Sequence, residues 1–133
     1  PPLPGAWYTV PVAWQQKVGQ ERRQYVRVRP TADYEVRAEL RAGEITEGML
    51  VVDLSVGGVK LLLSPAIEAV PIGGEVRIRL RAPRDPPCEV RAALRYRSAA
   101  LGTCGLQFVE PSEAVLRLLR HAVGDLLERG SLA

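Results

Sequence analysis

Arginines crowd one short segment of the chain at a spacing that suits an anionic ligand. Four of them lie within the eight positions 22–29, and Arg23 and Arg27 are separated by three residues. A guanidinium presents a planar fork of donors that fits a phosphate or the acceptor edge of guanine, and it also stacks on bases. Tyr25 and Val26 favour an extended backbone, so we interpret the segment as a loop that enters a strand. In that arrangement Arg23 and Arg27 can hold two sides of one ligand. The pattern is also typical of a solvated strand edge.

A second segment, Asp53-Leu54-Ser55-Val56-Gly57-Gly58, interrupts an apolar run and carries complementary chemistry. The Asp53 carboxylate can accept hydrogen bonds from N1 and N2 of guanine, the edge that distinguishes guanine from adenine. The Ser55 hydroxyl can add a contact, and Gly58 allows close approach of a ligand to the backbone. The alternative is a hairpin turn in which Asp53 and Ser55 bond only to the local backbone.

A mainly β scaffold is expected to position both segments. Residues 34–40 and 76–80 alternate apolar and charged side chains, which predicts half-buried antiparallel strands. Further strands are expected at 48–54, 59–63, 89–97 and 104–109. Six short strands separated by turn residues favour a small six-stranded antiparallel barrel over a sandwich.

The end of the chain changes to helical spacing. Pro111 and Ser112 are typical of a helix start, and apolar residues then recur at helical intervals until Gly130. This pattern predicts one amphipathic C-terminal helix at 112–129. We expect it to cover an open end of the barrel, with contact to a partner helix, as in a homodimer, as the alternative.

Composition bounds the class of protein. A chain of 133 residues with 47% hydrophobic and 25% charged residues fits one globular domain, and no apolar run approaches the roughly 18 residues that a membrane span needs. Sixteen of the 18 basic residues are arginines, which a GC-rich genome also explains. Cys88 and Cys104 match no disulfide framework or zinc spacing, so we expect a cytoplasmic protein without a metal.

Residues 1–20, rich in proline and tryptophan, are expected to form a lead-in or the end of a preceding domain, with the main domain at 21–133.

Taken together, the two segments resemble the signature of the PilZ domain, the bacterial receptor module for cyclic di-GMP (c-di-GMP). That signature is an Arg-x-x-x-Arg element followed by an Asp-or-Asn-x-Ser-x-x-Gly element, matched here by Arg23 to Arg27 and by Asp53 to Gly58. The resemblance covers residues 20–128 and includes a late strand, 105–109, similar to the family's Gly-x-x-Phe. It implies a PilZ-type β-barrel with a C-terminal helix.

The resemblance also implies roles for individual residues. Arg23 and Arg27 are expected to wrap the ligand through its phosphates and a guanine edge, and Asp53 and Ser55 to bind the other guanine. Gly58 is expected to let the ligand pass close to the backbone. The family further implies that Arg22 adds a phosphate or stacking contact, and that an arginine at this position can accompany binding of an intercalated pair of ligands.

The expected output is a disorder-to-order change of residues 1–29 on ligand binding, which would signal to a protein partner or an adjacent domain. The lead-in is similar to the junction in flagellar-brake relatives, which leaves motility, exopolysaccharide synthesis and transcription open as outputs.

Three other functions remain as alternatives. An enzyme is disfavoured because the only histidine, His121, falls in the predicted helix, and no histidine or lysine adjoins Asp53 or Ser55 in the sequence to activate a nucleophile. A single-stranded nucleic-acid binder would suit the arginines, but aromatic residues amount to only 5%. A PilZ-like interaction module that binds no ligand is the third alternative.

Overall fold

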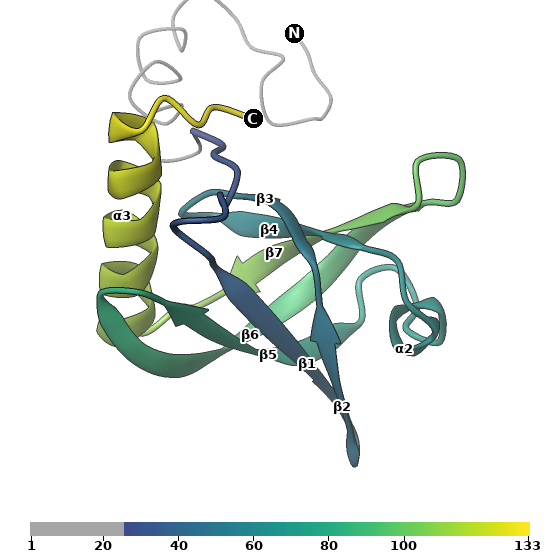
Figure 1. Cartoon of the computed structure of the whole chain (residues 1–133). Helices are drawn as coiled ribbons and strands as arrows, with labels where there is room; N and C mark the ends of the chain where they lie inside the picture. Colours follow the sequence, from purple (N-terminus) through teal and green to yellow (C-terminus); the bar gives the residue numbers. More distant parts are fainter. Residues whose placement is uncertain (1–25) are drawn as a thin grey trace, which may run out of the picture.

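The computed structural model describes residues 26–133 as one antiparallel sheet with two helices (Figure 1). The strands are β1 (Arg37–Ala42), β2 (Ile45–Met49), β3 (Val51–Leu54), β4 (Gly58–Leu62), β5 (Glu75–Ala82), β6 (Asp85–Ser98) and β7 (Thr103–Val109), and the helices are α2 (Pro65–Glu68) and α3 (Glu113–Glu128). The hydrogen-bonded order is β2-β1-β5-β6-β7-β4-β3. The lead-in at 1–20 and positions 22–25 of the arginine segment lie outside the described residues.

Alternation of side chains builds the sheet, as the sequence predicts. In β5, Val76, Ile78 and Leu80 are buried, whereas Arg77 between them is exposed. Successive side chains of a strand point to opposite faces, so one face of the sheet forms the core and the other carries the charged residues.

The sheet has seven strands instead of the expected six because the predicted strand 48–54 is divided at Leu50. The part before Leu50, β2, pairs with β1, and the part after it, β3, pairs with β4. The chain therefore passes from one end of the strand order to the other at Leu50. No ladder joins β2 to β3, so hydrogen bonds do not close the sheet into the expected barrel.

Helix α3 supplies the rest of the core, and it forms where helical spacing predicts it. Ser112 caps its start, with the side-chain oxygen accepting a hydrogen bond from the Val115 N–H at 3.3 Å. Figure 1 shows α3 and α2 at opposite ends of the molecule. The apolar side of α3 is buried in the same core as the strands, through Val115, Leu118, Leu119, Ala122, Val123 and Leu126.

Candidate functional site

The end of the arginine segment lies alongside β3. The Val28 N–H donates to the Leu54 carbonyl at 3.0 Å, and the Leu54 N–H donates back to the Val28 carbonyl at 2.9 Å. Val28 is fully buried in the core. This pairing anchors the backbone next to Arg27, so the Arg27 side chain lies beside β3.

Arg27 and Asp53 meet although they are 26 residues apart in the sequence. Arg27 Nη1 donates to Asp53 Oδ1 at 2.5 Å, and the Asp53 side chain is only 5% exposed while that of Arg27 is 34% exposed. Asp53 therefore does not bond merely within its own turn. The structure joins the two sequence motifs at this ion pair.

Lys60 is a third member of this cluster that sequence reasoning missed. Asp53 and Lys60 are directly opposed in the β3–β4 ladder, and Lys60 Nζ lies 3.5 Å from Asp53 Oδ2. The sequence could have indicated Lys60, because a tight turn at 55–58 places residue 53 opposite residue 60. Two cations thus flank one carboxylate, whose oxygens have about four lone-pair sites between them and can accept further hydrogen bonds.

Ser55 behaves as the local-turn interpretation expects. Its Oγ accepts hydrogen bonds from the N–H groups of Gly57 at 3.1 Å and Gly58 at 3.2 Å, and the residue is 1% exposed. The Ser55 N–H donates to the Gly58 carbonyl at 2.9 Å. Ser55 therefore shapes the β3–β4 turn that presents Asp53.

Gly58 is required by space at the β4–β7 contact. A Cβ atom at this position would collide with the backbone carbonyl oxygen of Leu106 in β7. Its φ is not in the left-handed region. The glycine thus permits close approach of β7 to the turn after Asp53.

The C-terminal residues hold the Arg27 segment from its other side. Ala133 N–H donates to the Arg27 carbonyl at 3.0 Å, Arg29 N–H donates to the Ser131 carbonyl at 3.0 Å, and Ser131 Oγ donates to the Arg29 carbonyl at 2.6 Å. The stretch 27–29 is therefore enclosed between β3 and the end of the chain. Figure 1 shows the C-terminus returning to this region above α3.

Tyr34, just before β1, is tied to α3. Its hydroxyl donates to Asp125 Oδ2 at 2.7 Å, and Arg84 Nη1 contacts Asp125 Oδ1 at 2.9 Å. Burial, followed by the hydrogen bond to Asp125, raises the pKa of Tyr34 to about 12. The hydrogen bond from Tyr34, assisted by Arg84, lowers the pKa of Asp125.

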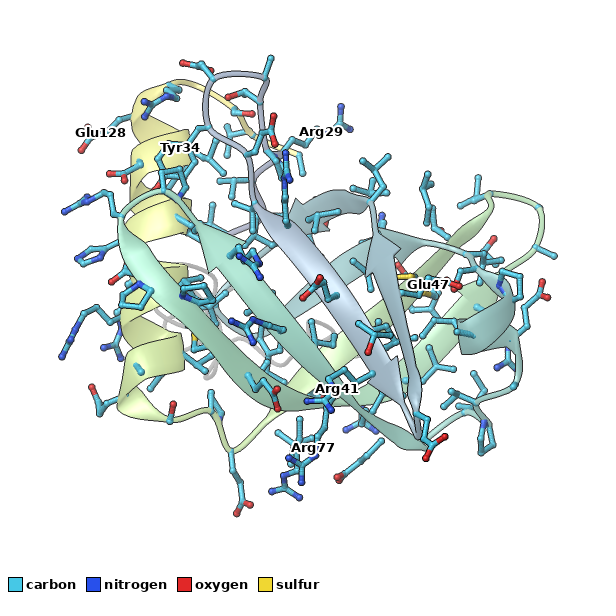
Figure 2. All side chains as sticks on the ribbon, turned by 60° about the horizontal axis from the view of Figure 1, so that its bottom comes forward. Arg29, Tyr34, Arg41, Glu47, Arg77 and Glu128 are labelled. Atoms are coloured by element: carbon cyan, nitrogen blue, oxygen red, sulfur yellow. The ribbon has the colours of Figure 1, made fainter. Side chains whose placement is uncertain are left out.

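A groove of about 740 Å³, lined in part by Arg41, Arg77 and Arg91, is a separate feature. Figure 2 shows Arg41 and Arg77 at one end of the molecule and Arg29 at the other. The groove's arginines are paired with glutamates: Arg41 with Glu89 at 3.1 Å, and Arg91 with Glu75 at 3.2 Å. The groove is therefore not the site that the two motifs form.

The remaining candidate groups lie elsewhere. His121 Nδ1 is 2.8 Å from Asp85 Oδ2 at the start of β6. Cys104 is buried and Cys88 is half-buried, and burial raises the pKa of both thiols. Within residues 26–133, no group of three or more His, Cys, Asp or Glu side chains is placed to hold a metal ion, and no helix is long and apolar enough to cross a membrane. Arg22 and Arg23 fall before the described residues.

Solved structures share this fold. The PilZ domain of YcgR from Escherichia coli, determined with c-di-GMP, is 20% identical with a TM-score of 0.63, and the match covers 82% of this chain and 94% of that one. MotI/DgrA, the inhibitor of motility from Bacillus subtilis, is 21% identical with a TM-score of 0.61, covering 80% of this chain and 52% of that one. MrkH of K. pneumonia, in its c-di-GMP complex, is 14% identical with a TM-score of 0.65, covering 78% and 51%. The chain thus spans about half the length of MotI and MrkH.

Among curated proteins, none matches the sequence significantly. The family model described as the PilZ domain matches residues 21–125, which include both motifs, the whole sheet and most of α3. The mainly β fold with a C-terminal helix agrees with that match, and the chain belongs to the PilZ domain family.

Proposed function

We propose that this chain is a receptor for c-di-GMP, which it binds on the outer face of β3 and β4. The observation that carries the proposal is the meeting of Arg27 with Asp53, flanked by Lys60. This cluster combines cations for phosphate with a charged acceptor for the N–H edge of guanine.

Family membership and the fold support the ligand class. The YcgR domain and MrkH were each determined with c-di-GMP, as was PlzA of Borreliella burgdorferi, which has a TM-score of 0.55 to this chain. These neighbours are 13–20% identical to the chain, so they support the fold, and the choice of ligand rests on the chemistry of the cluster.

Charge and hydrogen bonding make the assignment physically reasonable. The ligand carries two phosphate charges, and Arg22, Arg23 and Arg27 are proposed to neutralise them. Asp53 is proposed to read guanine, while Ser55 and Gly58 act by shaping the turn that presents it. Each charge-assisted hydrogen bond contributes roughly 1.5–3 kcal/mol, so a few of them reach the roughly −8 kcal/mol of a micromolar complex after ordering costs.

We further propose that binding orders the arginine segment and that this change is the output signal. Residues 27–29 already join β3 to the C-terminal residues. A ligand that fixes Arg22 and Arg23 would therefore extend an ordered segment from this anchor toward a lead-in at 1–20. The recipient of the signal is proposed to be a cytoplasmic protein partner or an adjacent domain.

Calorimetric titration tests the proposal. We expect saturable binding of c-di-GMP with at least tenfold preference over cyclic di-AMP, and loss of binding in Arg23→Ala and Asp53→Ala, with the exposed-arginine variant Arg117→Ala as control. The stoichiometry distinguishes one ligand from an intercalated pair. No heat with either nucleotide at tens of micromolar would refute the receptor function and favour a ligand-free interaction module.

A further inference from the structure

A row of directly opposed residues crosses the outer face of the sheet from Asp53. Asp53 in β3 is opposite Lys60 in β4, Lys60 is opposite Gly105 in β7, and Gly105 is opposite Tyr96 in β6. Directly opposed residues of antiparallel strands project to the same face. Asp53, Lys60 and Tyr96 therefore share one face of the sheet.

The ring of Tyr96 lies over Gly105. A Cβ atom on Gly105 would overlap three carbons of the ring, so the aromatic ring occupies the space where a side chain of β7 would stand. Tyr96 thus leans from β6 across β7 toward Lys60. The residue is still 39% exposed, although its ring rests on the backbone of Gly105.

We propose that Tyr96 is a base-stacking platform that binds one guanine of the nucleotide whose other guanine is read by Asp53. The inference rests on the proposed function and extends its site by two strands beyond the sequence motifs. The row presents an acceptor, a cation and an aromatic surface in succession, an order that matches base, phosphate and base in a dinucleotide.

Geometry and energetics fit this role. Neighbouring strands are about 4.8 Å apart, so a ring above Gly105 lies about two strand spacings, roughly 10 Å, from the Asp53 backbone. Lys60 stands between them, with its side chain 31% exposed. Removing an aromatic side chain on which a base stacks weakens binding by about 5- to 150-fold, which corresponds to 1–3 kcal/mol.

The variants Tyr96→Phe and Tyr96→Leu test the platform in the intact chain. Phenylalanine keeps the ring, so its dissociation constant for c-di-GMP should stay within about twofold of the unaltered protein. Leucine keeps an apolar cover on Gly105 but removes the ring, so binding should weaken by the factor given above. Leu62→Ala, at an exposed apolar position of β4 outside this row, should leave binding unchanged.

A second readout does not depend on any variant folding correctly. Nuclear Overhauser contacts between the ring protons of Tyr96 and H8 of guanine should appear on titration of the unaltered chain with c-di-GMP. Stacking is tolerant of base identity, so Tyr96→Leu should also leave the preference for guanine over adenine unchanged, unlike Asp53→Ala.

The outcomes separate this inference from the proposed function. Binding by the unaltered chain without these Overhauser contacts, or with a Tyr96→Leu affinity equal to that of the unaltered chain, overturns the platform and leaves the receptor function standing. Absence of binding by the unaltered chain overturns both.

Discussion

The two partners of the ion pair between Arg27 and Asp53 should differ in how much their loss destabilises the fold. The Asp53 side chain is 5% exposed and that of Arg27 is 34% exposed. Removing Arg27 therefore leaves a buried carboxylate behind, whereas removing the Asp53 carboxylate leaves a partly exposed guanidinium. In Arg27→Met, which keeps the apolar stem of the side chain, a buried carboxylate is left with Lys60 at 3.5 Å as its neighbouring cation. In Asp53→Asn, the partly exposed guanidinium can donate to the amide oxygen or to water instead.

The expected magnitudes follow from this difference in burial. Leaving a buried charged group without its hydrogen-bond partner costs about 1–3 kcal/mol or more. Replacing the carboxylate acceptor by a neutral amide keeps a hydrogen bond from the guanidinium and should cost only about 0.5–1.5 kcal/mol. We therefore expect Arg27→Met to destabilise the fold more than Asp53→Asn. The double variant should be less unstable than the sum, because it removes the buried charge as well as its partner.

Urea unfolding at neutral pH provides the assay, provided that the denaturant slope is unchanged among the variants. The exposed Arg29, in the same segment, supplies a matched control, and Arg29→Met should change the free energy of unfolding by less than about 0.5 kcal/mol. Equal losses of stability for the two single variants, or a larger loss for Asp53→Asn, would show that the difference in burial does not set the cost of breaking the ion pair.

Three further predictions concern the residues that support the site. Gly58→Ala should lower the free energy of unfolding by about 1–3 kcal/mol, because the new methyl group collides with a backbone carbonyl of β7; an unchanged melting temperature would contradict this. The pKa of Asp125 is lowered by Tyr34, so its contribution to stability should be complete above about pH 5 and lost as the pH falls through its folded-state pKa, as measured against Asp125→Asn. Removing residues 131–133 should speed hydrogen exchange at the Arg29 amide and weaken c-di-GMP binding several-fold.

Each of the last two has an internal control. A stability difference between Asp125→Asn and the unaltered chain that grows on acidification would carry the wrong sign. In the truncated chain, exchange at the Leu54 amide, which donates to Val28, should change less than exchange at Arg29, which donates to Ser131. Equal acceleration at both amides would indicate general loosening of the fold.

Local patterns account for most of the architecture. Alternation at 76–80 places Val76, Ile78 and Leu80 in the core, and the helix after Ser112 begins where its cap predicts. The division of one strand at Leu50 was not predicted, because it depends on a change of pairing partner from β1 to β4. Long-range pairing is a tertiary property that local periodicity does not encode.

The candidate site shows the same limit. Arg27 and Asp53 could be named from their motifs, and the structure brings them together. The burial of Ser55 in its own turn and the position of Tyr96 over Gly105 were not visible in the sequence, since both depend on the register between strands. The motifs thus indicated which residues to consider, and the register between strands determined which neighbours share their surface.

The most direct test of the binding site is a titration of the isotopically labelled chain with c-di-GMP, followed by amide chemical shifts. We expect the largest shifts at Val28, Asp53, Gly58 and Lys60, and we expect these shifts to disappear in Asp53→Ala. Shifts centred on the groove around Arg41, Arg77 and Arg91, with β3 and β4 unaffected, would contradict this expectation.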